Sequence, residues 1–267
     1  MTILRVMSFN IRYGSAEDGP QAWPHRRALV IERIRAFAPD LLGLQECRDG
    51  EQAGYVKTQL PEYNWLAVQR GGVSDSSPEM APILFRSTVF EWVTGGFFWL
   101  SETPNRPGSL SWGSALPRTV TWVELKLRQT PNRSVVFINT HLDYVPTATT
   151  AAARQLRQFI DTFDVATPII LTGDFNADKD SAPYRALLDN AAPNSPHLAD
   201  PYRTLHPADD VAAGSFHAFG ALKPARPIDW ILVSQSCRCL TIHVDLTHEG
   251  AFYPSDHYPV LATMEVG

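Results

Sequence analysis

The hydrophobic pattern of the chain predicts many short strands and few helices. Three segments carry the helical spacing of apolar residues or a helix-start signal, at residues 24–37, 149–163 and 183–190. Elsewhere apolar residues alternate or run together over short stretches, as is typical of β-strands, at residues 4–11, 41–45, 63–69, 81–86, 89–100, 119–127, 135–140, 169–172, 228–233, 240–246 and 258–264.

Many strands interspersed with helices predict an α/β protein in which two β-sheets pack face to face and helices lie outside them. A chain of 267 residues with 44% hydrophobic content can bury one sizeable core, so we expect a single domain over residues 1–267. Stretches rich in Pro, Gly and Ser predict long loops at residues 71–82, 101–117 and 193–214. Loops of that length in a compact domain are often functional.

Polar residues follow or begin six of the apolar runs. The clearest case is Gly173-Asp174-Phe175-Asn176, directly after the run 168–172. Such residues also form ordinary turns and caps, but substrates of layered α/β proteins usually bind at strand ends. The full series is Asn10, Gln45 with Glu46, His141 with Asp143, Asp174 with Asn176, Asp229, and Asp256 with His257.

Carboxylates gathered at one place predict a metal ion. Without a cation they would repel one another and raise each other's pKa. Oxygen donors such as Glu46 favour a hard cation, Mg²⁺ or Mn²⁺, over zinc. The three cysteines lack a zinc-site spacing and are expected to be buried or free thiols.

A hard cation beside carboxylates and imidazoles is typical of phosphoester hydrolysis, which needs an oriented water and stabilisation of charge on the phosphoryl oxygens. We assign Asp174 as the base and His257 as a phosphate contact. Asp229 is expected to fix the tautomer and hold the charge of His257.

The same ordered blocks resemble the endonuclease/exonuclease/phosphatase superfamily, which includes DNase I-like nucleases, deadenylases and phosphatases. The blocks are Ser8-Phe9-Asn10, Leu44-Gln45-Glu46, Asn139-Thr140-His141, Gly173-Asp174-Phe175-Asn176, Ile228-Asp229-Trp230 and Ser255-Asp256-His257. The resemblance implies a four-layer α/β sandwich with two mixed sheets.

For the site, the resemblance implies a divalent metal held mainly by Glu46, with Asn10 and Asp256 close to it. It further implies that Asp174 positions the attacking water and that Asn176 and His141 touch the scissile phosphate. The pair of Asp229 and His257 would then stabilise the transition state.

Two positions qualify the resemblance. Abasic-site endonucleases carry an acidic residue two positions after the equivalent of Asn10, where this chain has Arg12, which puts a second metal site in doubt. The segment Trp23 to Arg27 resembles the Trp-x-x-Arg segment of deadenylase-like and small bacterial branches. There, Arg26 and Arg27 are either exposed charges at a helix start, the interpretation that we favour, or contacts to substrate.

Four further residues are candidates for binding substrate. Arg118 opens a strand and has the geometry to hold a pair of phosphate oxygens, although a surface ion pair is an equal alternative. Trp112 lies in a loop, where it either stacks on substrate or packs on the core. His217 and Asp143 are the other two candidates, and His217 is a candidate for recognising the leaving group or a sugar.

We therefore expect a Mg²⁺- or Mn²⁺-dependent phosphoester hydrolase, a phosphodiesterase or phosphatase, in which a metal-assisted water attacks a small or medium phosphorylated substrate directly. The alternatives are a nuclease or 3′ exonuclease on single-stranded nucleic acid and a non-catalytic binding module with the same fold. A net charge of −5 argues against strong nonspecific binding of duplex DNA. No export signal or membrane-spanning run is visible, so we expect a cytoplasmic protein with no membrane association and no obligate protein partner.

Overall fold

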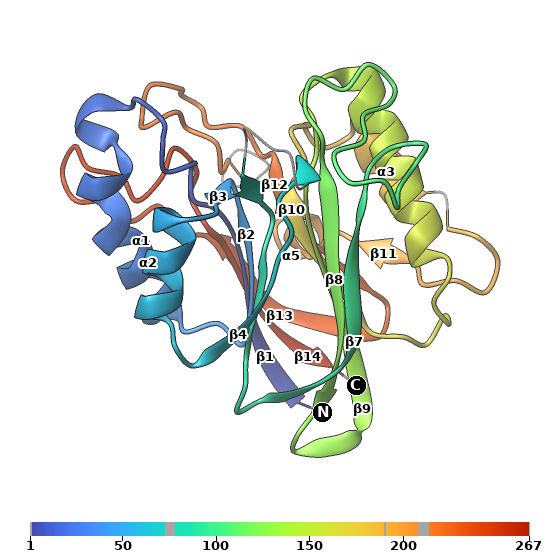
Figure 1. Cartoon of the computed structure of the whole chain (residues 1–267). Helices are drawn as coiled ribbons and strands as arrows, with labels where there is room; N and C mark the ends of the chain where they lie inside the picture. The colour runs from blue at the N-terminus through green and yellow to red at the C-terminus, as the bar shows by residue number, and fades with distance from the viewer. Residues whose placement is uncertain (1, 73–77, 190, 208–213, 267) are drawn as a thin grey trace.

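Two six-stranded sheets form the centre of the molecule (Figure 1). The computed structural model describes residues 2–72, 78–189, 191–207 and 214–266. The first sheet has the strand order β13-β14-β1-β2-β6-β4 and the second β11-β12-β10-β9-β8-β7, and β3 and β5 form a small third sheet. Both large sheets are mixed, because β1 runs parallel to β2 and β9 parallel to β10 while their other pairings are antiparallel.

The strand bounds agree with most of the predicted runs. They are β1 Thr2–Asn10, β2 Leu41–Gln45, β3 Cys47–Arg48, β4 Tyr63–Leu66, β5 Glu79–Met80, β6 Ile83–Arg86, β7 Phe90–Trp99, β8 Thr119–Leu127, β9 Thr130–His141, β10 Ile169–Asp174, β11 Leu198–Ala199, β12 Asp229–Ser234, β13 Cys237–Val244 and β14 Val260–Val266.

The alternation of side chains along each strand builds the four layers. In β10, Ile170 faces the core between the sheets, whereas Ile169 and Leu171 face the helices. In β1, Val6 points between the sheets and Phe9 points to the helices on the other side. Strands buried on both faces therefore read as continuous apolar runs. The predicted α/β sandwich of two mixed sheets with helices outside is confirmed.

Helices cover the outer face of each sheet. The helices α1 (Trp23–Phe37) and α2 (Glu51–Gln59) lie on the side of β1 and β2, and α3 (Pro146–Ile160) lies on the side of β8 and β9 (Figure 1). The helix α4 (Ala182–Leu188) packs beside α3, and α5 (Pro201–Leu205) packs on β12 and β13. A single 3₁₀ turn, Gly19–Gln21, precedes α1.

The predicted helices 24–37 and 149–163 correspond to α1 and α3, but the chain also forms α2 and α5, which the pattern did not predict. The predicted helix 183–190 corresponds to α4, and its last residue, 190, lies outside the described residues. Two parts of the predicted loops also lie outside the described residues, namely 73–77 of the loop 71–82 and 208–213 of the loop 193–214. The helix α5 lies within the predicted loop 193–214.

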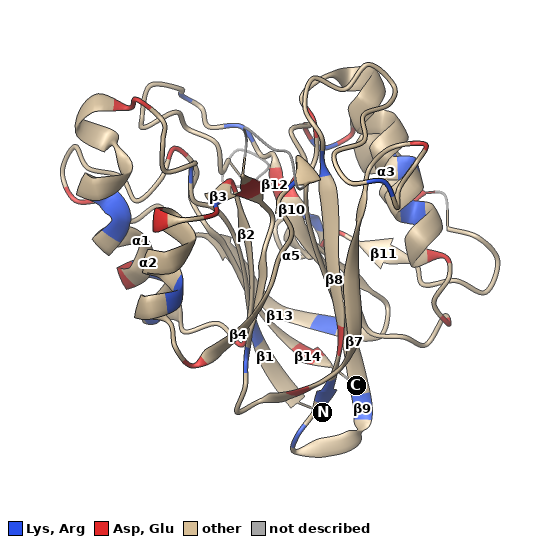
Figure 2. Cartoon of the chain, in the orientation of Figure 1, with Lys and Arg blue, Asp and Glu red and all other residues tan. Residues whose placement is uncertain are grey.

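Charge is spread over both halves of the molecule, and Figure 2 shows acidic residues at the ends of β10 and β12. None of the helices in the described ranges combines the length and the apolar character needed to cross a membrane. The cysteines are free thiols, and Cys47 and Cys237 are buried.

Candidate active site

The strand ends place the polar series at one edge of both sheets. In the second sheet, Asp174 at the end of β10 stands opposite His141 on one side and Asp229 on the other. In the first sheet, Asn10 at the end of β1 stands opposite Gln45, and Glu46 follows directly. Because parallel neighbours end at the same edge, the sheet registers alone bring these groups together.

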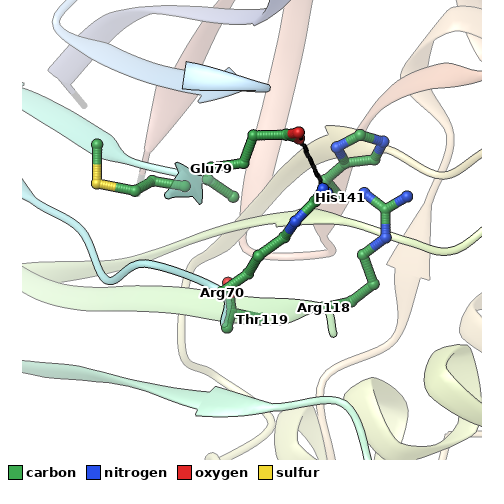
Figure 3. Close-up of a pocket in the computed structure, with 7 residues that line it drawn as sticks. Arg70, Glu79, Arg118, Thr119 and His141 are labelled. Carbon is green, nitrogen blue, oxygen red and sulfur yellow. Dashed lines mark hydrogen bonds and ion pairs between the residues drawn. The ribbon is translucent and has the colours of Figure 1, made fainter. Parts of the chain in front are cut away.

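His141 lies at a small cavity next to this edge. Arg70, Arg118 and Glu79 line the same cavity, and Figure 3 shows both guanidinium groups extending toward the imidazole. Burial, together with the positive charges of Arg118 and Arg70, lowers the pKa of His141 well below its ordinary value. His141 is therefore neutral at neutral pH. Its Nε2 lies 3.1 Å from Asn176 Nδ2.

Asp174 is the centre of the site. Its Oδ2 accepts a hydrogen bond of 2.9 Å from Asn10 Nδ2, and its Oδ1 accepts one of 2.9 Å from the backbone N–H of Asn176. His141 Nε2 and His257 Nε2 lie 3.5 and 3.8 Å from Oδ2. Burial, and secondarily the negative charge of Asp229, raises the pKa of Asp174. Asp174 is thus a carboxylate with a heightened tendency to take up a proton.

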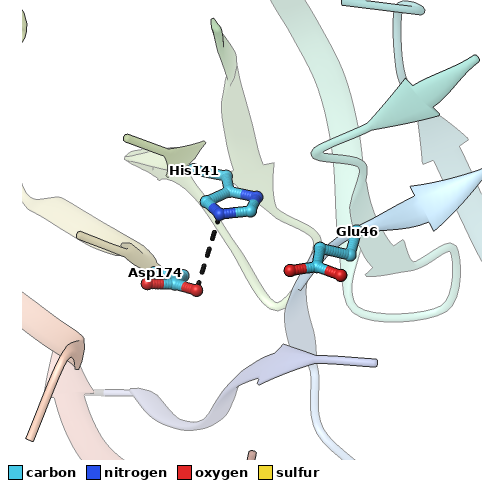
Figure 4. Close-up of side chains that lie close together, drawn as sticks. All are labelled: Glu46, His141 and Asp174. Atoms are coloured by element: carbon cyan, nitrogen blue, oxygen red, sulfur yellow. Dashed lines mark ion pairs between the residues drawn. The ribbon is translucent and has the colours of Figure 1, made fainter. Parts of the chain in front are cut away.

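Glu46 approaches the same centre from the first sheet. Its backbone has a positive φ of 56°, which turns the chain directly after β2. The carboxylate accepts hydrogen bonds from Asn10 Nδ2 (3.2 Å) and from the backbone N–H of Tyr13 (3.1 Å). Figure 4 shows Glu46 facing His141 and Asp174. Asn10 therefore bridges the two carboxylates, one from each sheet.

His257 and Asp229 form a buried ion pair. His257 Nδ1 donates to Asp229 Oδ2 at 2.7 Å. Burial alone would lower the pKa of His257, but the charge of Asp229 and this hydrogen bond outweigh it and raise the pKa to about 10. His257 is an imidazolium at neutral pH, and its Nε2 faces Asp174.

The donor set fits a hard divalent cation. Ligand atoms of Glu46, His141 and Asp174 all lie within 4.8 Å of one another. Oxygen atoms predominate in this group, as Mg²⁺ and Mn²⁺ prefer. The raised pKa of buried Asp174 also indicates a carboxylate whose charge the surrounding protein compensates incompletely.

Arg12 stands between Asp256 and Glu46. Its Nε lies 3.7 Å from Asp256 Oδ2, and its Nη1 lies 4.0 Å from Glu46 Oε2. Asp18 holds the guanidinium through two hydrogen bonds of 3.1 Å. The position where an acidic residue would add a metal ligand thus carries a fixed positive charge.

The four substrate-binding candidates have different surroundings. Arg118 is buried in the cavity beside His141, so it is not a surface ion pair. Asp143 is buried and accepts hydrogen bonds from the backbone N–H groups of Ala115, Leu116 and Val145. Its carboxylate therefore shapes the loop before β8.

His217 and Trp112 also contact other parts of the protein. His217 is buried, stacks on Tyr258 with ring centroids 3.8 Å apart, and accepts a hydrogen bond at Nδ1 from the N–H of Gly220. Its backbone N–H donates to the carbonyl of Asp256. Trp112 is half-buried and packs against the core between the second sheet and α3. A role in substrate binding stays a prediction for all four residues.

Arg26 corrects one expectation from the sequence. Its side chain is fully buried rather than exposed, and it donates to the carbonyls of Ile11 (2.6 Å), Arg12 (2.8 Å) and Pro254 (3.0 Å). An arginine can be buried because carbonyl oxygens receive its donors. Arg26 thereby ties the segment after Asn10 to the segment before Asp256. Arg27 is partly exposed and pairs with Glu51.

Sequence reasoning also missed Arg70 and Glu79. The guanidinium of Arg70 contacts the carboxylate of Glu79 at 2.9 Å, and both side chains line the cavity next to His141. Arg70 directly follows the predicted strand 63–69, so the rule of polar residues at strand ends would have found it. Glu79 lies within a predicted loop and carried no such signal.

Comparisons with known proteins identify the family of the chain. Residues 7–257 match the Endonuclease/Exonuclease/phosphatase family. An endonuclease/exonuclease/phosphatase structure from Bacteroides vulgatus is 28% identical with a TM-score of 0.88, and the match covers 100% of both chains. A mannosyl-6-phosphatase from Bacteroides thetaiotaomicron is 29% identical with a TM-score of 0.83, covering 98% of this chain and 99% of that one.

The fold extends to more distant proteins. The human Nocturnin catalytic domain, solved with a bound sulfate anion, is 19% identical with a TM-score of 0.78, and the match covers 98% of this chain and 94% of that one. At that identity the likeness concerns the fold alone. The match to the family spans all six of the polar blocks that meet at the strand ends. The chain therefore belongs to the Endonuclease/Exonuclease/phosphatase family and is a hydrolase of that family.

Proposed function

We propose that the protein is a Mg²⁺- or Mn²⁺-dependent phosphoester hydrolase that acts on a small or medium phosphorylated substrate by direct attack of water. The observation that carries this proposal is the position of Asp174. One of its carboxylate oxygens faces Asn10, His141 and His257, and Glu46 lies beside it.

Asp174 serves as the general base. A carboxylate with a raised pKa is a better proton acceptor near neutral pH than an exposed aspartate. The hydrogen bonds from Asn10 and from the Asn176 backbone fix the orientation of the carboxylate. Asp174 would thus hold a water toward the phosphorus atom and take its proton at Oδ2.

His257 stabilises charge that develops on the phosphoryl oxygens. The ion pair with Asp229 keeps the imidazole protonated and fixes the ring, so that Nε2–H points to the site. His141, which is neutral, and Asn176 would contribute hydrogen bonds to the same phosphate.

A single divalent ion would be held by Glu46 with Asn10 and Asp256 close by. When bound, such an ion neutralises phosphoryl oxygens as a Lewis acid. The fixed charge of Arg12 between Glu46 and Asp256 favours one ion over two. The relative described as a mannosyl-6-phosphatase and the net charge of −5 both favour a small phosphorylated substrate over long duplex nucleic acid.

Hydrolysis of p-nitrophenyl phosphate and bis-p-nitrophenyl phosphate tests the proposal. We expect turnover with Mg²⁺ or Mn²⁺, loss of turnover in EDTA, and recovery when the metal is restored. In ¹⁸O-labelled water the label should enter the released phosphate. Asp174→Asn should lower kcat by about 10² to 10⁴, the usual contribution of an acid–base group.

Asp189→Asn is the matched control, because it makes the same chemical change at an exposed carboxylate, at the residue that directly follows α4. Activity that persists after complete chelation would contradict the metal requirement. Cleavage of labelled single-stranded oligonucleotides in preference to both small esters would favour the nuclease alternative instead.

A further inference from the structure

Arg118 is a buried cation with hydrogen-bond donors left over. Only 5% of the residue is exposed, and its Nε and Nη1 have no hydrogen-bond partner among the described residues. Asp143 Oδ2 is 3.9 Å from Nε, and this oxygen already accepts two backbone hydrogen bonds. Leaving donors of a buried charge unpaired is costly. An anionic group that enters the site would remove that cost.

The space beside Arg118 is small and partly open. The cavity has a volume of about 10 Å³ and is lined by Arg70, Glu79, Met80, Ala81, Arg118, Thr119 and His141. That volume holds about one oxygen-sized group. The pair of Arg70 with Glu79 forms one wall (Figure 3), and His141 connects the cavity to the active site, because its Nε2 lies 3.5 Å from Asp174 Oδ2. An oxygen atom therefore fits this space as it stands, whereas an organic substituent would have to displace the side chains that line it.

This size limit distinguishes two classes of phosphoester. In an in-line displacement, three oxygens of the phosphoryl group lie between the attacking and the leaving oxygens. In a phosphomonoester all three are unsubstituted, whereas in a phosphodiester one of them carries a second organic group. In the proposed function these oxygens would lie at the Glu46 side, at His257 and at the cavity of Arg118. If the two unsubstituted oxygens of a phosphodiester occupied the first two places, its substituted oxygen would be left at the small cavity.

We propose that Arg118 determines specificity by binding an unsubstituted phosphoryl oxygen in this cavity, so that the enzyme prefers phosphomonoesters to phosphodiesters. This inference rests on the proposed hydrolase function and narrows its substrate class. Water supplies the new P–O bond, and the bond to the leaving alcohol breaks. Arg118 takes part in no bond and contributes charge and hydrogen bonds.

The test compares p-nitrophenyl phosphate with methyl p-nitrophenyl phosphate, which differ by one methyl group on a phosphoryl oxygen and by the negative charge that this group removes. The wild type should have the higher kcat/KM for the monoester. Arg118→Met should lower kcat/KM for the monoester by about 10- to 100-fold, the effect expected from lost hydrogen bonds to a charged group. The same variant should change the diester value by less than about threefold. Arg118→Lys, which keeps the charge, should fall between the wild type and Arg118→Met.

Two results would overturn the inference, namely a wild-type preference for the diester or an equal loss for both esters in Arg118→Met. Arg154→Met, which removes an exposed arginine from α3, is the matched control. Thermal unfolding of each variant shows whether a loss of activity comes from misfolding. If Arg118→Met is misfolded, the ratio of kcat/KM for the monoester to that for the diester in Arg118→Lys decides: a ratio below that of the wild type supports the inference, and an unchanged ratio overturns it.

Binding of inorganic phosphate, measured by calorimetry with Mg²⁺ present, separates this inference from the proposed function. We expect binding to the wild type to weaken by about tenfold or more in Arg118→Met. Equal affinity in both proteins would overturn the role of Arg118 even where hydrolysis is observed. If neither ester is hydrolysed but Arg118→Met weakens phosphate binding, the hydrolase proposal fails and the anion site stands.

Discussion

At the scale of single residues, burial gives the titratable groups of the site different protonation states. Asp174 has a raised pKa, His257 is held as an imidazolium by Asp229, and His141 is held neutral. A proton acceptor, a cation and a neutral hydrogen-bonding group thus lie within a few ångströms. This is the division of roles that acid–base chemistry on a phosphoester requires.

The charge state of His257 is open to direct test in metal-free protein. Because Asp229 is the main cause that raises the pKa of His257, Asp229→Asn should return its pKa from about 10 toward its ordinary value or below it. NMR titration of the imidazole measures this change. Asp189→Asn should leave the titration of His257 unchanged, and an unaltered His257 pKa in Asp229→Asn would contradict the account.

The same pair predicts a dependence of stability on pH. The folded-state pKa of His257 lies above the unfolded value of 6.5, so its stabilisation is complete below pH 6.5 and is lost as pH rises through about 10. The free-energy difference between wild type and Asp229→Asn, measured by urea unfolding, should therefore shrink over that interval. A difference that grows with pH over the same range would be inconsistent with the ion pair.

Residues at strand ends could be predicted from the sequence because a local pattern reveals them. Asp174 and Glu46 follow apolar runs, and the structure brings them together as expected. The burial of Arg26 could not be predicted in this way, because its carbonyl partners come from residues 11, 12, 21 and 254. Such contacts exist only after the chain has folded.

At the scale of elements, hydrogen bonds join the two sheets near the site. Asn139 of β9 accepts a hydrogen bond from Gln45 Nε2 (2.7 Å) and one from Thr172 Oγ1 (3.0 Å), and its amide donates to the carbonyl of Leu44 (2.7 Å). This buried network joins β2 to β9 and β10. The strand ends that carry Glu46, His141 and Asp174 are thereby fixed relative to one another.

Gly43 of β2 permits this close approach. A Cβ at this position would clash with Thr172 Oγ1 and lie 2.5 Å from Asn139 Oδ1. Gly43→Ala should therefore lower the free energy of unfolding by about 1–3 kcal/mol, as overpacking of a core does, measured by urea denaturation. Gly54→Ala in α2 is the control, since a Cβ there meets nothing within 4 Å and alanine favours the helix. Unchanged stability of Gly43→Ala would show that the sheets can separate without cost.

The elements missed in the sequence are short or weakly patterned. The helix α2 has nine residues, contains Gly54 and buries only Gln52, Ala53 and Val56, so its apolar face is too small to produce a clear periodicity. The helix α5 has five residues and lies in a stretch rich in Pro, Gly and Ser. Its start is nevertheless capped by Asp200, which accepts from the N–H groups of Tyr202 and Arg203.

At the scale of the whole molecule, the four layers explain why the site lies where it does. Two sheets that pack face to face, each with parallel strands at its centre, present the ends of β1, β2, β9 and β10 at one edge. Each sheet contributes groups that the other lacks. Glu46 and Asn10 come from the first sheet, and His141, Asp174 and Asp229 come from the second.

We expect these groups from both sheets to surround one hard cation. Anomalous diffraction from crystals of the wild type soaked in Mn²⁺ measures this most directly. We predict a single anomalous peak at about 2.1 Å from a carboxylate oxygen of Glu46, a coordination distance typical of such ions, and next to Asp174. A peak remote from both carboxylates, or two peaks of similar height at the site, would show that Glu46 and Asp174 do not share one ion.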